Sequence, residues 1–142
     1  MRLVDANVLL NAVNEDSREH PAARGWLEDS LNGNEAVGFA WVVLLAFIRV
    51  STRPGIFARP FDAETACTYA EEWLAQPVSV VVNPTPRHLS ILTSLLDDAG
   101  TGGNLTTDAH LAALALEHGS EVWSFDRDFA RFRGLKVRVP AA

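Results

Sequence analysis

The feature that most constrains the fold is the alternation of short apolar stretches with longer helical patterns along the chain. The apolar stretches are rich in valine and too short for buried helices, so they predict strands. We expect strands at residues 2–4, 36–40, 78–82, 121–125 and 136–139, and the β-branched strand at 78–82 is expected to be buried. We expect helices from residue 7 onward and at residues 20–31, 41–50, 61–75, 86–99, 105–118 and 127–132. Asn7 is the expected cap of the first helix, and Asp62 is the expected cap of the helix at 61–75. Strands that alternate with helices predict an α/β fold with a mostly parallel sheet covered on both faces.

Composition agrees with one globular domain over residues 1–142. Hydrophobic residues make up 48% of the chain and charged residues 21%, which is an ordinary balance for a folded domain. The apolar N-terminal stretch is interrupted by Asp5 and Asn7, so it predicts neither a signal peptide nor a membrane span. One cysteine, Cys67, cannot form an intrachain disulfide, and in a helical stretch it is expected to be buried. We therefore expect a cytoplasmic protein.

The net charge of −6 and the pI of about 5.1 argue against a nucleic-acid binder, because phosphate binding usually requires a basic surface. The objection weakens if several of the acids are metal ligands, since each bound divalent cation reverses the local sign of charge. The placement of the acids therefore decides how the charge is interpreted.

Aspartates follow two of the predicted strands. Asp5 ends the first strand, and Asp126 ends the strand at 121–125. Asp108 lies in the first turn of an alanine-rich helix, where the helix dipole favours an acid, and Asp128 follows Asp126 by two residues. Ligands of open parallel sheets lie beyond the carboxyl ends of the strands. The sequence therefore predicts a group of carboxylates at one edge of the sheet.

Carboxylates that converge without a lysine or arginine repel one another, and a hard divalent cation resolves the repulsion. Mg²⁺ prefers oxygen ligands and often combines a few carboxylates with a substrate phosphate, where it activates water for attack on phosphorus. Asp5, Asp108, Asp126 and Asp128 are the candidate metal ligands. A second interpretation remains open, because each aspartate by itself is also suited to cap a helix.

Two motifs of this chain resemble the PIN-domain family, and more narrowly the VapC-type toxins of bacterial toxin–antitoxin pairs. The first is LVDANVLL at the N-terminus, and the second is GNLTTDAHLAALALEHGSEVWSFDRDFARFRGLKV near the C-terminus. The resemblance implies a PIN-like three-layer domain with a central parallel five-stranded sheet flanked by helices. It also implies an endoribonuclease that depends on Mg²⁺, or on Mn²⁺, and cleaves RNA phosphodiester bonds as the toxin of a type II toxin–antitoxin system. A VapB-like antitoxin, an RNA substrate and a homodimer are the partners it implies.

The resemblance also implies roles for single residues. Asp5, Asp108 and Asp126 match three of the four family acids and are the expected catalytic residues, and Asp128 matches an accessory acid. The remaining family acid is a glutamate three residues before an arginine. Here Ala46 stands at that place, three residues before Arg49, so the site has one carboxylate fewer.

Three further residues are candidates for substrate binding. Asn7 matches a polar position two residues after the first aspartate, and Arg49 lies where RNA is expected to approach. Thr107 is expected either to cap its helix or to orient the substrate. The apolar helix at 41–50 is expected to be mainly core, with the remainder available to an antitoxin helix or a second copy of the chain. The four histidines are scattered, and none is given a catalytic role.

Two alternatives to the ribonuclease hypothesis remain. The first is a catalytically weak or silent PIN-like binding module, which the missing glutamate and the acidic charge favour. The second is a phosphatase like the haloacid dehalogenases, with Asp5 as the covalent nucleophile. That family requires a second acid where Asn7 stands and a lysine near the site, whereas Lys136 is the only lysine and lies in the last predicted strand.

Overall fold

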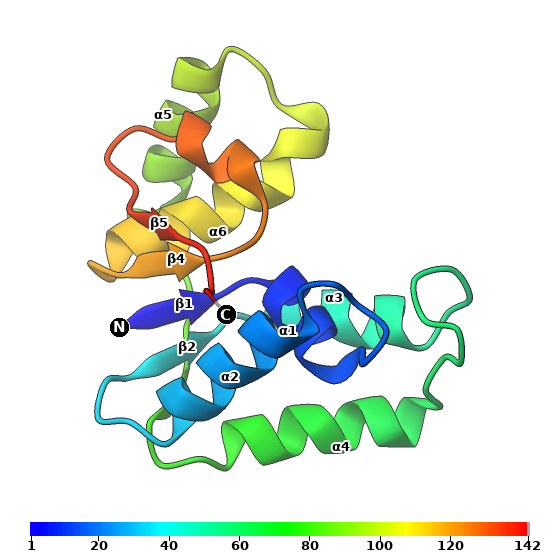
Figure 1. Cartoon of the computed structure of the whole chain (residues 1–142). Coiled ribbons are helices and arrows are strands. Elements are labelled where there is room, and N and C mark those ends of the chain that lie inside the picture. Colours follow the sequence, from blue (N-terminus) through cyan, green and yellow to red (C-terminus); the bar gives the residue numbers. More distant parts are fainter. Residues whose placement is uncertain (142) are drawn as a thin grey trace.

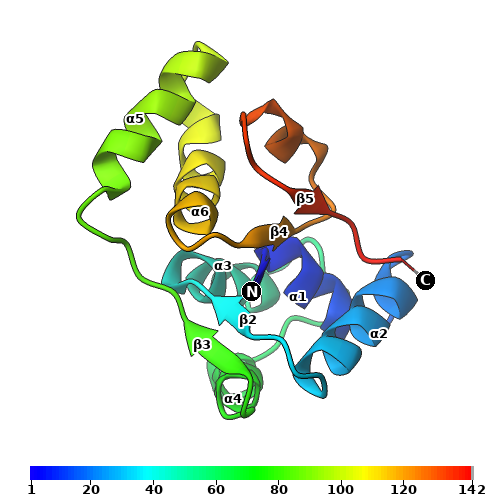
Figure 2. The same cartoon turned by 90° about the vertical axis from the view of Figure 1, so that its left-hand side faces the viewer.

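The sheet at the centre of the protein has five strands, all parallel, in the order β3-β2-β1-β4-β5 (Figure 1 and Figure 2). The computed structural model describes residues 1–141. The strands are β1 (Arg2–Val4), β2 (Val37–Phe39), β3 (Ser79–Val81), β4 (Glu121–Trp123) and β5 (Val137–Arg138). All five predicted strands and the flanked parallel sheet are confirmed.

Helices cover both faces of this sheet. Helices α1, α2 and α4 lie on one face, and α5 and α6 lie on the other (Figure 2), while α3 packs against α1 and α4. The α-helices are α1 (Ala6–Val13), α2 (His20–Leu31), α3 (Trp41–Ser51), α4 (Ala63–Leu74), α5 (His88–Ala99) and α6 (Thr106–Glu117). Two short 3₁₀ helices, η1 (Gly103–Leu105) and η2 (Arg127–Arg131), precede α6 and follow β4. Over residues 1–141 we find no helix of the length and apolar character that a membrane span needs.

Three local expectations were wrong. Helix α1 is capped by Asp5, whose side chain accepts a hydrogen bond from the Ala6 N–H, and not by Asn7. Strand β3 is half-exposed rather than buried, because it is the edge strand of the sheet. Cys67 is exposed, because it lies outside the face of α4 that carries the buried Ala66, Ala70 and Trp73. The short helix expected at residues 127–132 is confirmed as the 3₁₀ helix η2.

The middle of the sheet is the most tightly packed part of the core. Leu3 and Val4 of β1 and Val122 of β4 have no exposed surface. Gly38 of β2 leaves little room for a side chain, since a Cβ there would lie 2.8 Å from Val82 Cγ2 and 3.1 Å from Leu3 Cδ1. Close packing of this kind fixes the ends of the central strands, from which the aspartates extend.

Strand β1 is the point where the chain changes direction across the sheet. The chain leaves β1 through α1 and α2 to reach β2 on one side, and it later returns through α5 and α6 to β4 on the other side. Crevices in parallel sheets open at such a switch point, beyond the carboxyl ends of the strands. Asp5 follows β1, and Asp126 follows β4 three residues after Trp123, so both lie at this edge.

Candidate active site

Asp5 is held at the end of β1 by two hydrogen bonds. Its Oδ1 accepts the Ala6 N–H at 2.7 Å, and its Oδ2 accepts the Ser124 hydroxyl at 2.7 Å. Asp5 therefore caps α1, as one of the two interpretations predicted, and it is also bonded to the segment after β4. Each carboxylate oxygen keeps a second lone pair for another ligand.

Asn7 and Ser124 join the first helix to the segment that carries Asp126. The Asn7 Oδ1 accepts the Phe125 N–H at 3.1 Å, and the Asn7 Nδ2 donates to the Ser124 Oγ at 3.1 Å. The Ser124 Oγ also accepts the Asp126 N–H at 2.9 Å. Both the oxygen and the nitrogen of the Asn7 amide therefore form hydrogen bonds with the segment after β4. These bonds fix the position of Asp126 relative to Asp5.

Asp108, Asp126 and Asp128 form an acidic cluster. One carboxylate oxygen from each of them lies within 4.8 Å of the other two. The Asp126 Oδ1 accepts the Asp128 N–H at 2.9 Å, so Asp126 also caps η2. Asp5 is not one of these three, but it lines a cavity of about 40 Å³ together with Asp108. Asp5 therefore adjoins the cluster at Asp108, and Ser124 bridges it to Asp126.

The electrostatics of this edge match a site built for a cation. Burial raises the pKa of Asp108, and the charges of Asp126, Asp5 and Asp128 raise it further, to about 6. Burial also raises the pKa of Asp5, against hydrogen bonds from Ser124 and Ala6 that lower it. Within residues 1–141, none of the four aspartates forms a salt bridge with a lysine, arginine or histidine.

The donor set of the cluster fits a hard divalent cation. It offers carboxylate oxygens alone, which are the ligands that Mg²⁺ and Mn²⁺ accept in proteins. It is also partly exposed, so water and a phosphate oxygen have room to complete a coordination shell. The residues present therefore fit the predicted metal.

Two of the remaining residues singled out in the sequence, Thr107 and Ala46, line the small cavity beside the aspartates, whereas Arg49 does not. Thr107 lines the small cavity beside Asp5 and Asp108. Its expected capping role is wrong, because no side chain caps the start of α6. Ala46, where the resemblance implies a glutamate, lines the same cavity as Asp5 and Asp108. Arg49 is exposed near the end of α3 and lines neither of the cavities that Asp108 lines.

Sequence reasoning missed Ser124, which has no exposed surface. Its hydroxyl connects Asp5, Asn7 and Asp126. A small hydroxyl residue between a strand and an aspartate, as in the stretch SFD, was the available clue. The clue was weak because serine is equally common in ordinary strand-to-turn segments.

The match to known proteins is unambiguous. The model of the PIN domain family matches residues 2–135 of this chain. The chain belongs to the PIN-domain family. Ribonuclease VapC37 of Mycobacterium tuberculosis is 52% identical over 142 residues, which cover 100% of this chain and 99% of that protein. This PIN domain is therefore a member of the VapC ribonuclease toxins, as its motifs predicted.

Solved structures share the fold of this PIN domain. The complex VapBC2 from Rickettsia felis, bound to a DNA fragment from its promoter, has a chain with a TM-score of 0.71 at 13% identity, and the match covers 97% of each chain. Mycobacterium tuberculosis VapC20, a toxin that cleaves the sarcin–ricin loop, has a TM-score of 0.70 at 19% identity, with 96% of this chain and 99% of that chain covered. These likenesses confirm the PIN-like architecture.

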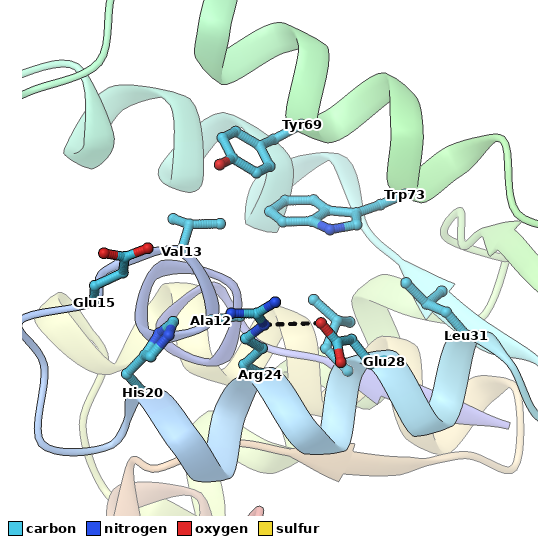
Figure 3. A pocket seen from close by; sticks show the side chains of 10 residues that line it. Ala12, Val13, Glu15, His20, Arg24, Glu28, Leu31, Tyr69 and Trp73 are labelled. Atoms are coloured by element: carbon cyan, nitrogen blue, oxygen red, sulfur yellow. Dashed lines mark hydrogen bonds and ion pairs between the residues drawn. The ribbon is translucent and has the colours of Figure 1, made fainter.

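A second cavity of this PIN domain lies between α1, α2 and α4 and has a volume of about 330 Å³ (Figure 3). Its walls combine apolar and aromatic side chains, including Val13, Leu31, Tyr69 and Trp73. Arg24 and Glu28, whose side chains form a salt bridge of 2.8 Å, add charge to it. None of the four aspartates lines this cavity, so it is separate from the acidic edge.

Proposed function

We propose that this VapC-family protein is a metal-dependent endoribonuclease in which Asp5, Asp108 and Asp126 are the catalytic carboxylates. The observation that carries the proposal is the convergence of carboxylates, without a cationic partner in residues 1–141, at the carboxyl edge of a parallel sheet. A folded protein keeps such mutual repulsion only where something else compensates it, as it does at functional sites. The acidic net charge is then compatible with an RNA substrate.

Asp108, Asp126 and Asp128 would hold Mg²⁺ or Mn²⁺, and Asp5, which lines a cavity together with Asp108, would be the further carboxylate of the site. When bound, the cation supplies Lewis-acid activation of a water and stabilises charge on the phosphoryl oxygens. The protein supplies the geometry. Ser124 and the Ala6 N–H hold Asp5, and Ser124 and Asn7 hold the segment that carries Asp126. Preorganised carboxylates of this kind avoid reorganisation during the reaction.

Two measurements test the proposal. Purified protein is expected to cleave total RNA in Mg²⁺ or Mn²⁺ and to lose cleavage when EDTA is added. Asp5→Asn is expected to lose cleavage and most metal affinity while keeping the fold, since an amide preserves the shape of the side chain. Asp29→Asn on the exposed face of α2 is the matched control and is expected to cleave like the unmodified protein. Unchanged cleavage by Asp5→Asn would contradict the proposed role.

The family assignment bears on the two alternatives. A phosphatase with Asp5 as nucleophile requires a lysine near the site, but Lys136 lines a cavity at the opposite edge of the sheet with Met1 and Arg2. Membership of the VapC ribonucleases removes this alternative. The silent binding module makes a separate prediction, because it would show no cleavage and no Mg²⁺ or Mn²⁺ binding at millimolar concentration.

We further propose that the partner is a VapB-like antitoxin and that one of its amphipathic segments docks in the cavity of Figure 3. The two-component VapBC2 complex supports a protein partner. Apolar walls with charges beside them suit an amphipathic helix. Arg24→Glu is expected to weaken binding of the protein encoded by the neighbouring open reading frame, while RNA cleavage by the free toxin stays unchanged. Unchanged binding would place the antitoxin elsewhere.

A further inference from the structure

A cavity of about 290 Å³ adjoins the acidic cluster, since Asp108 and Asp128 both line it. It is lined by the turn at residues 101–105 together with Asp108, Asp128 and Arg131. Asp108 lines both this turn cavity and the small cavity that contains Asp5. The turn cavity therefore lies next to the carboxylates of the proposed active site.

Arg131 is the only cationic side chain that lines either of these two cavities. It stands three residues after Asp128, yet across residues 1–141 it takes part in no salt bridge. The guanidinium group thus lies at an acidic site without being neutralised by it. A positive charge in that position remains available for an anion.

The backbone of Arg131 is fixed even though its side chain is exposed. Phe129 and Phe132, on either side of it, are 0% and 3% exposed, and their rings meet edge to face with centroids 6.1 Å apart. The side chain therefore extends from a rigid support. Arg133, two residues further on, is also exposed but lines neither cavity.

The turn that lines the cavity contains two glycines, Gly102 and Gly103. Gly103 has a φ of +55°, which favours glycine, and a Cβ at this position would meet no atom within 4 Å. These two positions therefore contribute no side chain to the cavity that Arg131 lines.

From these contacts we infer that Arg131 binds a backbone phosphate of the RNA next to the one that is cleaved, and that the turn cavity holds this phosphate. The inference rests on the proposed function, because it takes the acidic cluster as the place of cleavage. A guanidinium fork matches the geometry of phosphate oxygens, and a bound nucleotide chain carries phosphates on both sides of the reacting one. Arg131 is thus a substrate-positioning residue and not a catalytic one.

The test compares Arg131→Gln with Arg133→Gln on a single-stranded RNA oligonucleotide in Mg²⁺. Loss of one charge-assisted phosphate contact is expected to raise KM by roughly tenfold, while kcat stays within about twofold of its original value because the reacting groups are untouched. Arg133→Gln is expected to leave both constants unchanged. Arg131→Lys is expected to recover part of the loss, because it keeps the charge but not the fork.

A second measurement does not depend on cleavage. RNA binding is measured against salt concentration in an Asp5→Asn background, with and without Arg131→Gln. Loss of one phosphate contact reduces the slope of log K against log salt by about 0.7 for a single strand. An unchanged slope with an unchanged KM overturns the inference, and so does a fall in kcat alone. Failure of the unmodified protein to cleave RNA contradicts the proposed function instead, and the salt slope still decides the role of Arg131.

Discussion

Helix α6 carries one partly buried and one fully buried carboxylate, and their pKa values are shifted in opposite directions. Asp108, in its first turn, has a pKa raised to about 6 by burial and by three neighbouring aspartates. Glu117, at its last residue, has a side chain with 0% exposure. Burial alone would raise the pKa of Glu117, but hydrogen bonds from Thr85 and His88 outweigh it and lower the pKa.

The helix dipole predicts the reverse order, since it favours an acid at the start of a helix and disfavours one at the end. Tertiary contacts decide the outcome here. The Glu117 Oε1 accepts the Thr85 N–H at 3.0 Å and the Thr85 hydroxyl at 2.5 Å, and the Glu117 Oε2 lies 2.5 Å from the His88 Nδ1. One carboxylate is fully satisfied by the protein, whereas the other is placed among like charges.

Within one helix, Glu117 serves the packing of the fold, whereas Asp108 is a carboxylate of the proposed active site. Glu117 ties the start of α5 to the end of α6, and the His88 Nε2 lies 2.8 Å from the His110 Nδ1, which extends the polar contact along the same interface. Asp108 does nothing comparable for packing. Its position among like charges is the feature that the proposed divalent cation would compensate.

The largest expected effect is on activity. Asp108→Asn is expected to reduce the rate of RNA cleavage in Mg²⁺ by at least about 100-fold, because a charged ligand that stabilises the transition state is removed. Cleavage rates of purified protein provide the measurement. If Asp108→Asn and Glu117→Gln reduced the rate equally with both proteins folded, the proposed division between the two acids would be wrong.

The next effect is on stability. Glu117→Gln is expected to lower the free energy of unfolding by about 2 kcal/mol, because the charge that pairs with Thr85 and His88 is lost from a buried position. Chemical denaturation at pH 7 measures it, with Glu72→Gln on the exposed face of α4 as control. The folded pKa of Glu117 is depressed, so its contribution is present above its ordinary pKa of 4.5 and is lost as the pH falls through the folded value.

A smaller effect is expected on metal affinity when a carboxylate is added at Ala46. Ala46→Glu returns a carboxylate to the cavity that Asp5 and Asp108 share, and it is expected to tighten Mn²⁺ binding by roughly tenfold, since affinity follows the number of charged ligands. Without metal, the added repulsion is expected to lower the melting temperature. Leu45→Glu adds the same charge at a side chain that is 56% exposed. Equal effects of the two variants on Mn²⁺ binding would show that the position of the charge is unimportant.

The smallest effect appears in EDTA, where the repulsion around Asp108 has no cation to relieve it. Asp108→Asn is expected to stabilise the metal-free protein at pH 7.5 by about 1 kcal/mol once solvent screening is allowed for. The folded pKa of about 6 lies above the ordinary value of 3.8. The folded protein therefore takes up a proton before the unfolded chain does, and the advantage of the variant shrinks as the pH falls from 6 toward 4. Melting curves at several pH values would show it, and an advantage that grew on acidification would contradict the assignment.

Much of the fold followed from local patterns that tertiary context does not override. Helix α2 begins at His20 and ends at Leu31, as predicted, because Pro21 suits a first turn and Gly33 follows its end. Asp62 caps α4 as expected. Strand β3 was misjudged, because its run of valines shows β-propensity but not whether a neighbouring strand covers its outer side.

The placement of the acids after strands was visible in the sequence, and so were the family motifs that contain them. Ser124 was missed, and so was the meeting of His88, His110 and Glu117, which are separated by up to 29 residues. A hydrogen bond between distant residues depends on how elements pack, and no periodicity records that. The same limit applied to Arg131, whose importance arises from the cavity beside it and not from its neighbours in the chain.

Hydrophobic periodicity and strand-end chemistry are local properties. They were therefore enough to predict the elements, their alternation into a parallel sheet and the aspartates that follow the strands. The packing of distant segments places Asp108 among three other acids and gives Glu117 three hydrogen bonds. The free energy of a buried charge depends on what surrounds it within a few ångströms. Those surroundings come from segments that are remote along the chain.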